Sequence, residues 1–111
     1  MRKLLEPIKI GNMELRNRVV LSAMAKYFCT NGYIGREYCE YYRNIAHGGT
    51  ALIIPGIMCV EPKWYGQHEQ PFLNDDKYIP GLKMAIDAVH EEGAKFACQL
   101  WMPGLPGGER P

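Results

Sequence analysis

The fold is decided by the stretch from Gly35 to Ile54, GREYCEYYRNIAHGGTALII, which joins an amphipathic helix directly to a buried strand. Gly48-Gly49 ends the helix, and Ala51 to Ile54 is an apolar run typical of a strand buried on both faces. The stretch therefore predicts a helix over 35–47 and a strand over 51–54. Apolar side chains at spacings of three, four and seven form one face of the helix: Tyr38, Tyr41, Tyr42 and Ile45.

The same unit continues on both sides of this stretch. Arg18 to Ala23 is an earlier strand-like run, and Lys95 to Leu100 is a later one. A second helix is expected to begin near Asp75-Asp76, with Pro80 in its first turn, and to stop at Gly93. Strands that alternate with helices predict a parallel sheet, and three strands are too few to close one. The apolar face of the second helix is expected at Leu82, Ala85, Ile86 and Val89.

We therefore predict an α/β fold that is the N-terminal portion of a (β/α) barrel, with about three strands and two helices. Residues 1–111 are expected to be a truncated part of one domain. Ile8 to Leu15 alternates around Gly11-Asn12, which predicts a small hairpin cap before the sheet. From Gly56 to Lys77 we expect a long loop without clear periodicity. It follows a strand's carboxyl end, where barrels assemble their active sites.

Composition and charge exclude several classes of protein. The chain is 47% hydrophobic with a formal charge of +1 and no block of like charges, so neither a nucleic-acid surface nor a membrane-binding face is indicated. The four cysteines contain no C-x-x-C pair, which argues against a zinc site and a disulfide-stapled secreted scaffold. We expect a cytoplasmic protein whose partner is a small molecule or another protein. The open sheet edge predicts a homo-oligomer or association through that edge.

Several blocks of the sequence occur together in an order that points to a family. They are Pro7 to Val20 (PIKIGNMELRNRVV), Tyr41-Tyr42 with Gly48 to Ile54, Ile79 to Lys83, Asp87 to His90, and Gln99-Leu100-Trp101. This series resembles the old yellow enzyme group of NADH:flavin oxidoreductases, and within it the branch of 2,4-dienoyl-CoA and other enoate reductases. The resemblance implies a (β/α)8 barrel with FMN that takes hydride from NADH or NADPH and reduces an activated alkene.

The resemblance also implies a cofactor-binding stretch, Ser22-Ala23-Met24-Ala25, which would line the isoalloxazine ring just past the first strand. The alternative is a strand end that turns into a loop of small residues. Gly56 matches a small residue that lets the flavin approach the main chain. Its alternative is a turn glycine beside Pro55.

Gln99 is the strongest single candidate for a flavin contact. An amide near the end of an apolar strand is costly to bury unless its donors and acceptor are paired, and a flavin edge offers both kinds of partner. The alternative is an amide satisfied by neighbouring main chain. Tyr27 matches a tyrosine that reaches toward substrate in some relatives, or is a half-exposed loop aromatic. Weaker loop candidates are Trp64, Tyr65 and His68, while His47 and His90, each in the last turn of a helix, are expected to be structural.

The departures from the family pattern limit these expectations. Ala23 stands where many relatives have proline, Ala25 where many have threonine, cysteine or glycine, and Met102 where a histidine often follows. The proton donor and phosphate-binding loops of the family belong to later strands, so no catalytic residue is assigned. An iron–sulfur cluster is expected only if a longer parent chain carries it, because this chain has no cysteine cluster. We expect the chain alone to be inactive. The competing hypothesis is a non-catalytic oligomeric or interaction module derived from the barrel.

Overall fold

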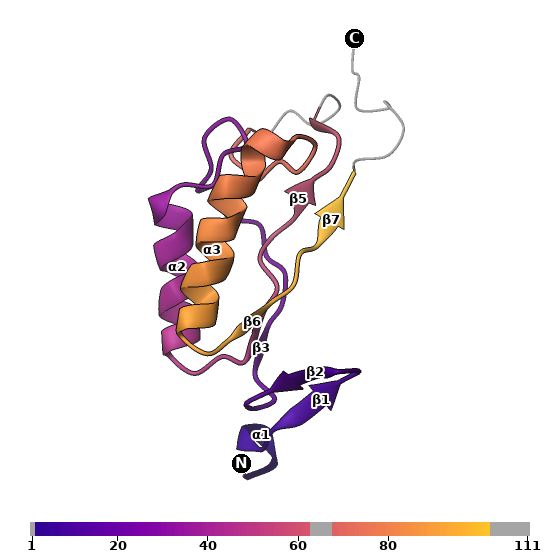
Figure 1. Cartoon of the computed structure of the whole chain (residues 1–111), viewed down its shortest axis with the longest axis vertical. Helices are drawn as coiled ribbons and strands as arrows, with labels where there is room; N and C mark the ends of the chain where they lie inside the picture. Colours follow the sequence, from indigo (N-terminus) through magenta and orange to yellow (C-terminus); the bar gives the residue numbers. More distant parts are fainter. Residues whose placement is uncertain (1, 63–67, 103–111) are drawn as a thin grey trace.

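The computed structural model describes residues 2–62 and 68–102. Its centre is a parallel sheet in the order β3-β4-β6, formed by β3 (Val20–Leu21), β4 (Leu52–Ile53) and β6 (Lys95–Phe96). Two helices, α2 (Arg36–His47) and α3 (Ile79–Glu91), stand side by side on one face of these strands (Figure 1). Each helix connects one strand to the next parallel strand, as the sequence predicts.

The strands are shorter than their apolar runs. In β3 and β4, Val20 pairs with Leu52 and Leu21 with Ile53, and the pairing continues into β6 through Phe96. The apolar residues around them, such as Ala23 and Ile54, lie outside the assigned strands. Apolar residues also occur where the chain is partly buried without pairing to another strand. The strand bounds predicted from the apolar runs were therefore too wide.

The predicted hairpin precedes this sheet. It consists of β1 (Ile8–Ile10) and β2 (Met13–Leu15), which pair antiparallel in the register Ile10 opposite Met13. Gly11 has φ +57° in the connecting turn, a conformation that glycine adopts without steric cost. A short helix that the sequence analysis missed, α1 (Arg2–Leu5), comes before the hairpin, and both lie at the end of the molecule opposite β5 and β7 (Figure 1).

Local sequence explains where the two long helices begin and end. Gly35 is the N-cap of α2, and the last turn of α2 is followed by the predicted Gly48-Gly49 stop. A single 3-10 turn, η2 (Asp76–Tyr78), leads into α3, and the Asp75 carboxylate accepts a 3.0 Å hydrogen bond from the Lys77 N–H. Pro80 lies in the first turn of α3, where a missing N–H costs no helical hydrogen bond.

Apolar side chains fill both faces of the sheet. On the helical face, Ile53 packs against buried residues of both helices, including Tyr38, Tyr42, Ala85 and Val89. The predicted tyrosine stripe is therefore part of the core. On the opposite face a second cluster forms around Leu15 and Leu52, so the hairpin covers the lower part of that face.

One part of the topology was predicted wrongly. The expected loop from residue 56 to 77 contains β5 (Met58–Cys59), and the expected third strand is split into β6 and β7 (Leu100–Trp101). β5 and β7 pair parallel, with Met58 opposite Leu100, and they extend above the central sheet (Figure 1). Further along the chain, the segment around Pro71 also lies beside β5, and the Cys59 N–H donates to the Pro71 carbonyl at 2.8 Å. Two-residue strands carry no periodicity, so the sequence pattern does not reveal them.

Candidate functional site

The carboxyl ends of the three parallel strands meet in a single rim, which we define as residues 22–25, 56 and 99. Gly56 lies so close to Ala25 that a Cβ atom on the glycine would sit 2.6 Å from the Ala25 Cα. The Gln99 carbonyl accepts a 2.9 Å hydrogen bond from the Met58 N–H, two residues beyond Gly56. The structure therefore brings the predicted residues of all three strands together.

The segment after β3 presents its main chain at this rim. Ser22, Met24 and Ala25 are exposed, and Ala23 is half-buried. Among the described residues, no main-chain hydrogen bond involves residues 22–28, whereas the neighbouring Leu21 carbonyl accepts from the Ile54 N–H at 3.0 Å. The main-chain groups of Ser22 and Ala23 therefore have no main-chain partner among the described residues, whereas the Met24 carbonyl and the Ala25 nitrogen lie against Gly56.

Gln99 is exposed, so the argument that it is a buried amide in need of partners is wrong for this structure. Its main chain lies on the rim, and its side-chain amide is accessible there. The buried amide is instead Gln70, which is 1% exposed and whose Oε1 and Nε2 have no hydrogen-bond partner among the described residues. Sequence reasoning missed Gln70 because it lies in a segment without regular periodicity.

Gly56 is buried, and packing within the protein already requires glycine at this position. The space for its Cβ is occupied by main-chain atoms of this chain: the Ala25 Cα, the Met24 carbonyl oxygen and the Ala25 nitrogen, at 2.6, 2.8 and 3.0 Å. The Gly56 N–H donates a 3.5 Å hydrogen bond to the buried Tyr42 hydroxyl. Packing within the protein therefore accounts for glycine here.

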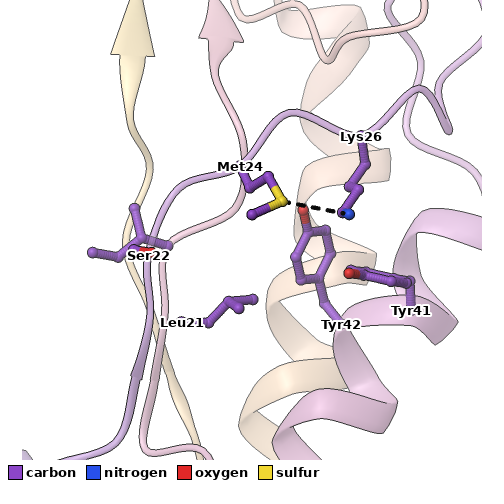
Figure 2. Close-up of a pocket in the computed structure, with 7 residues that line it drawn as sticks. Leu21, Ser22, Met24, Lys26, Tyr41 and Tyr42 are labelled. Carbon is purple, nitrogen blue, oxygen red and sulfur yellow. Dashed lines mark hydrogen bonds between the residues drawn. The ribbon is translucent and has the colours of Figure 1, made fainter.

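A pocket of about 130 Å³ opens beside the rim, between the segment after β3 and α2 (Figure 2). The Lys26 Nζ lies 3.7 Å from the Met24 sulfur and 5.5 Å from the centre of the Tyr41 ring. Sites for drug-sized ligands are commonly ~300–1,000 Å³, so this pocket is too small to hold a flavin ring. Its lining residues are Leu21, Ser22, Met24, Lys26, Tyr41, Tyr42 and Ile54.

The aromatic and histidine side chains that the sequence offers as loop candidates lie in different parts of the structure. Tyr27 is 61% exposed, two residues beyond Ala25. The His68 ring is exposed and lies edge-on to Phe72, with 6.0 Å between ring centres, so it belongs to an aromatic group on the loop. Trp64 and Tyr65 lie outside the described residues. Of these candidates, Tyr27 is the one that lies next to residues 22–25 in the chain.

The histidines at the helix ends contribute to structure. His47 lies in the last turn of α2, and its Nδ1 is 2.9 Å from a carboxylate oxygen of Glu92 at the end of α3. His90 lies in the last turn of α3. Their positions agree with the structural role predicted for both residues.

All four cysteines are free. Cys29, Cys39 and Cys59 are buried, and burial raises the pKa of each of these thiols. Such thiols stay neutral and are poor nucleophiles at ordinary pH. Within the described ranges, no three His, Cys, Asp or Glu side chains are grouped so that they could hold a metal ion. None of the described helices is long and apolar enough to cross a membrane.

Comparisons with known proteins support this interpretation of the fold. The chain is 38% identical over 103 residues to a metal reductase of Desulforamulus reducens, a match that covers 91% of this chain and 15% of that protein. Its structure is similar to an old yellow enzyme from Trypanosoma cruzi, with a TM-score of 0.82 and 29% identity, covering 96% of this chain and 28% of that one. A 2-naphthoyl-CoA reductase complexed with 2-naphthoyl-CoA gives a TM-score of 0.85 and 33% identity, covering 89% of this chain and 15% of that one.

The chain thus spans between 15% and 28% of the length of these three relatives. The predicted fold class, a portion of a (β/α) barrel, is confirmed by the structural similarity. The sequence profile of the NADH:flavin oxidoreductase / NADH oxidase family matches residues 3–107, and the chain belongs to this family.

Proposed function

We propose that this chain is the N-terminal part of an FMN-dependent NAD(P)H oxidoreductase that reduces activated alkenes of the enoate or enoyl thioester type. The observation that carries the proposal is the rim, where Ala25, Gly56 and the Gln99 main chain adjoin at the carboxyl ends of parallel strands. Active sites of (β/α) barrels lie at this end of the strands. Family membership and the 2-naphthoyl-CoA reductase relative, whose ligand is a CoA thioester, support the substrate class.

The residues of the rim fit a flat, polar ring. The main chain of residues 22–25 carries donors and acceptors without partners among the described residues, and the exposed Gln99 amide adds two donors and one acceptor. Of the rim residues, Ser22, Ala23, Met24, Ala25 and Gln99 would contact FMN, and the buried Gly56 would support the main chain of Ala25. Bound there, FMN would supply the hydride transfer from a reduced nicotinamide to the alkene.

Each part of the chain then has a limited role. The main chain of residues 22–25 would orient the ring, and the Gln99 amide would select its edge by hydrogen bonding. Tyr27, exposed and next to the rim, would contact the substrate. Residues that donate the proton and bind the phosphate are not assigned within residues 1–111, so the chain alone is expected to be inactive. Residues 1–111 would then form part of a single FMN-binding barrel domain in a cytoplasmic protein.

The proposal is tested by purifying the full-length protein and measuring its flavin content and its FMN affinity by fluorescence titration. Gln99→Leu should weaken FMN binding about tenfold, because it removes one polar partner while keeping similar bulk. The matched control is Asn44→Leu, another exposed amide, on α2 and outside the rim. Unchanged affinity in Gln99→Leu would exclude Gln99 from the site, and a wild-type protein that binds no FMN would contradict the whole proposal.

A second function is favoured by one observation: the chain exposes large apolar side chains along its strands. Val20 is 43% exposed at the open edge of the sheet, and Leu100 is 63% exposed on β7. Such surface fits a non-catalytic module that covers its open edge with a second copy or a partner chain. A colourless preparation that sediments as an oligomer would support this function, and a yellow preparation with bound FMN would support the oxidoreductase.

A further inference from the structure

The contact between Gly56 and Ala25 sets how closely the main chain of the segment after β3 approaches residue 56. A Cβ atom at position 56 would meet main-chain atoms of residues 24 and 25 within 3.0 Å, a separation that real Cβ atoms essentially never show. The obstructing atoms belong to the main chain, so no side-chain rotation relieves the overlap. Any residue larger than glycine must therefore displace the main chain of the segment after β3.

Gly56 also contacts α2. Its N–H donates to the Tyr42 hydroxyl at 3.5 Å, and the Tyr42 side chain is 1% exposed. The Tyr42 ring packs against the rings of Tyr38 and Tyr41, with 4.8 and 5.0 Å between centres. Its hydroxyl points away from the helix, toward the segment that carries Met24 (Figure 2). Gly56 therefore contacts both the Tyr42 hydroxyl of α2 and the main chain of residues 24 and 25.

The segment after β3 is held on α2 by side chains, with Phe28 and Lys26 packed on the Tyr41 ring, but its main chain has few partners. Among the described residues, the main chain of residues 22–28 takes part in no main-chain hydrogen bond, and its first partner beyond them is the Glu69 carbonyl, which accepts from the Cys29 N–H at 2.9 Å. Packing on Gly56 is the contact that restrains the main chain of Ala25 directly.

We infer that Gly56 and Tyr42 are positioning residues, which act on the flavin rim through the main chain of Met24 and Ala25 rather than by touching the cofactor. The effect on flavin rests on the function proposed above, whereas the effect on residues 24 and 25 does not. A change at either residue shifts the groups that face the ring, without removing any of them.

The experiment compares Gly56→Ala with Gly81→Ala in the full-length protein. Gly81 is also crowded, since a Cβ there would lie 2.7 Å from the Ile34 carbonyl oxygen, but this contact involves no rim residue. Hydrogen–deuterium exchange of peptides that cover residues 20–30 and 50–55 reports on the rim through the Cys29 and Ile54 N–H groups, whose hydrogen bonds flank residues 22–28. FMN affinity and the visible absorption spectrum report on the cofactor. We expect faster exchange, about tenfold to a hundredfold weaker FMN binding and a shifted flavin band only in Gly56→Ala.

Tyr42→Phe tests the same inference if Gly56→Ala does not fold, because it removes only the hydroxyl that accepts from the Gly56 N–H. It should raise exchange in the same peptides and weaken FMN binding to a smaller extent. Equal exchange and FMN affinity in wild type, Gly56→Ala and Tyr42→Phe would overturn the inference, as would the same response in Gly81→Ala. If the wild type binds no FMN, the proposed function fails, and the exchange of the same peptides still decides whether Gly56 and Tyr42 position the rim.

Discussion

The Arg16 guanidinium donates a 2.7 Å hydrogen bond to the main-chain carbonyl of Glu92, the C-cap residue of α3. The same side chain donates to the carbonyl of Ala46, in the last turn of α2, at 2.6 Å and to that of Thr50 at 3.0 Å. One arginine that follows the hairpin thus satisfies carbonyls at the ends of both helices. A cation is favoured beside carbonyls at the C-terminal end of a helix, and the Ala46 carbonyl also accepts from the Gly49 N–H at 3.0 Å.

Arg16→Met should lower the free energy of unfolding by about 2 kcal/mol, because it removes three charge-assisted hydrogen bonds that are partly exposed. Chemical denaturation monitored by circular dichroism measures this change. Arg18→Met is the matched control, since the described part of the chain gives the exposed Arg18 side chain no partner, and it should change stability by less than about 0.5 kcal/mol. Equal losses in the two variants would show that the Arg16 hydrogen bonds contribute nothing specific.

Tyr38 and Tyr42 provide a second matched pair. Both are 1% exposed on the same face of α2, but the Tyr42 hydroxyl accepts from the Gly56 N–H, whereas the Tyr38 hydroxyl has no partner among the described residues. Tyr38→Phe should therefore leave stability unchanged or raise it by about 1 kcal/mol, and Tyr42→Phe should lower it by about 1 kcal/mol. Thermal and chemical denaturation of the two variants give the comparison. A loss in Tyr38→Phe as large as that in Tyr42→Phe would contradict it.

The sequence predicted those parts of the fold that depend on local pattern. The helix over 35–47 and the helix structure over 76–91 agree with the predictions because a 3.6-residue period, caps and a glycine stop mark both of them. Segments β5 and β7 were missed because each is two residues long and exists only through pairing of Met58 with Leu100, which are 42 positions apart. Such pairing depends on tertiary structure, which a local pattern does not contain.

The candidate site divides in the same way. Topology alone places the carboxyl ends of parallel strands at one edge, so the proximity of Ala25 and Gly56 followed from the strand assignments. The environment of each residue did not follow. Gln99 was expected to be buried and is exposed, while the buried amide is Gln70. Burial of a single polar side chain depends on what the rest of the chain packs against it, and neither of these residues lies in a segment whose period identifies its buried face.

The buried Cys29 thiol should make the fold sensitive to alkaline pH. Burial, with a smaller contribution from Cys39, raises the pKa of this thiol from its ordinary value of 9.0 to about 12. Above pH 9.0 the unfolded chain loses the proton while the folded chain retains it, so the free energy of unfolding falls as pH rises. This contribution is fully present below pH 9.0 and is lost as pH approaches about 12.

Cys29→Ala should therefore show a shallower decline of stability above pH 9.0 than the wild type, whatever its stability at neutral pH. Urea denaturation at a series of pH values measures the slope. Comparing slopes rather than absolute values separates the titration from the cavity that the smaller side chain leaves. Parallel curves for the two proteins would show that Cys29 does not titrate differently in the folded and unfolded states.

Two glycines in left-handed turns separate backbone strain from steric overlap. Gly11 has φ +57° and open space where a Cβ would lie, whereas Gly32 has φ +81° and a Cβ there would overlap the Phe72 ring. Gly11→Ala should cost about 1 kcal/mol, the strain of alanine in this conformation. Gly32→Ala should cost at least about 3 kcal/mol, because the buried Phe72 must also move. Denaturation midpoints measure both losses, and since the Phe72 N–H donates to the Gly32 carbonyl at 3.0 Å, its exchange rate should rise only in Gly32→Ala. Equal losses in the two variants would mean that Phe72 yields without cost.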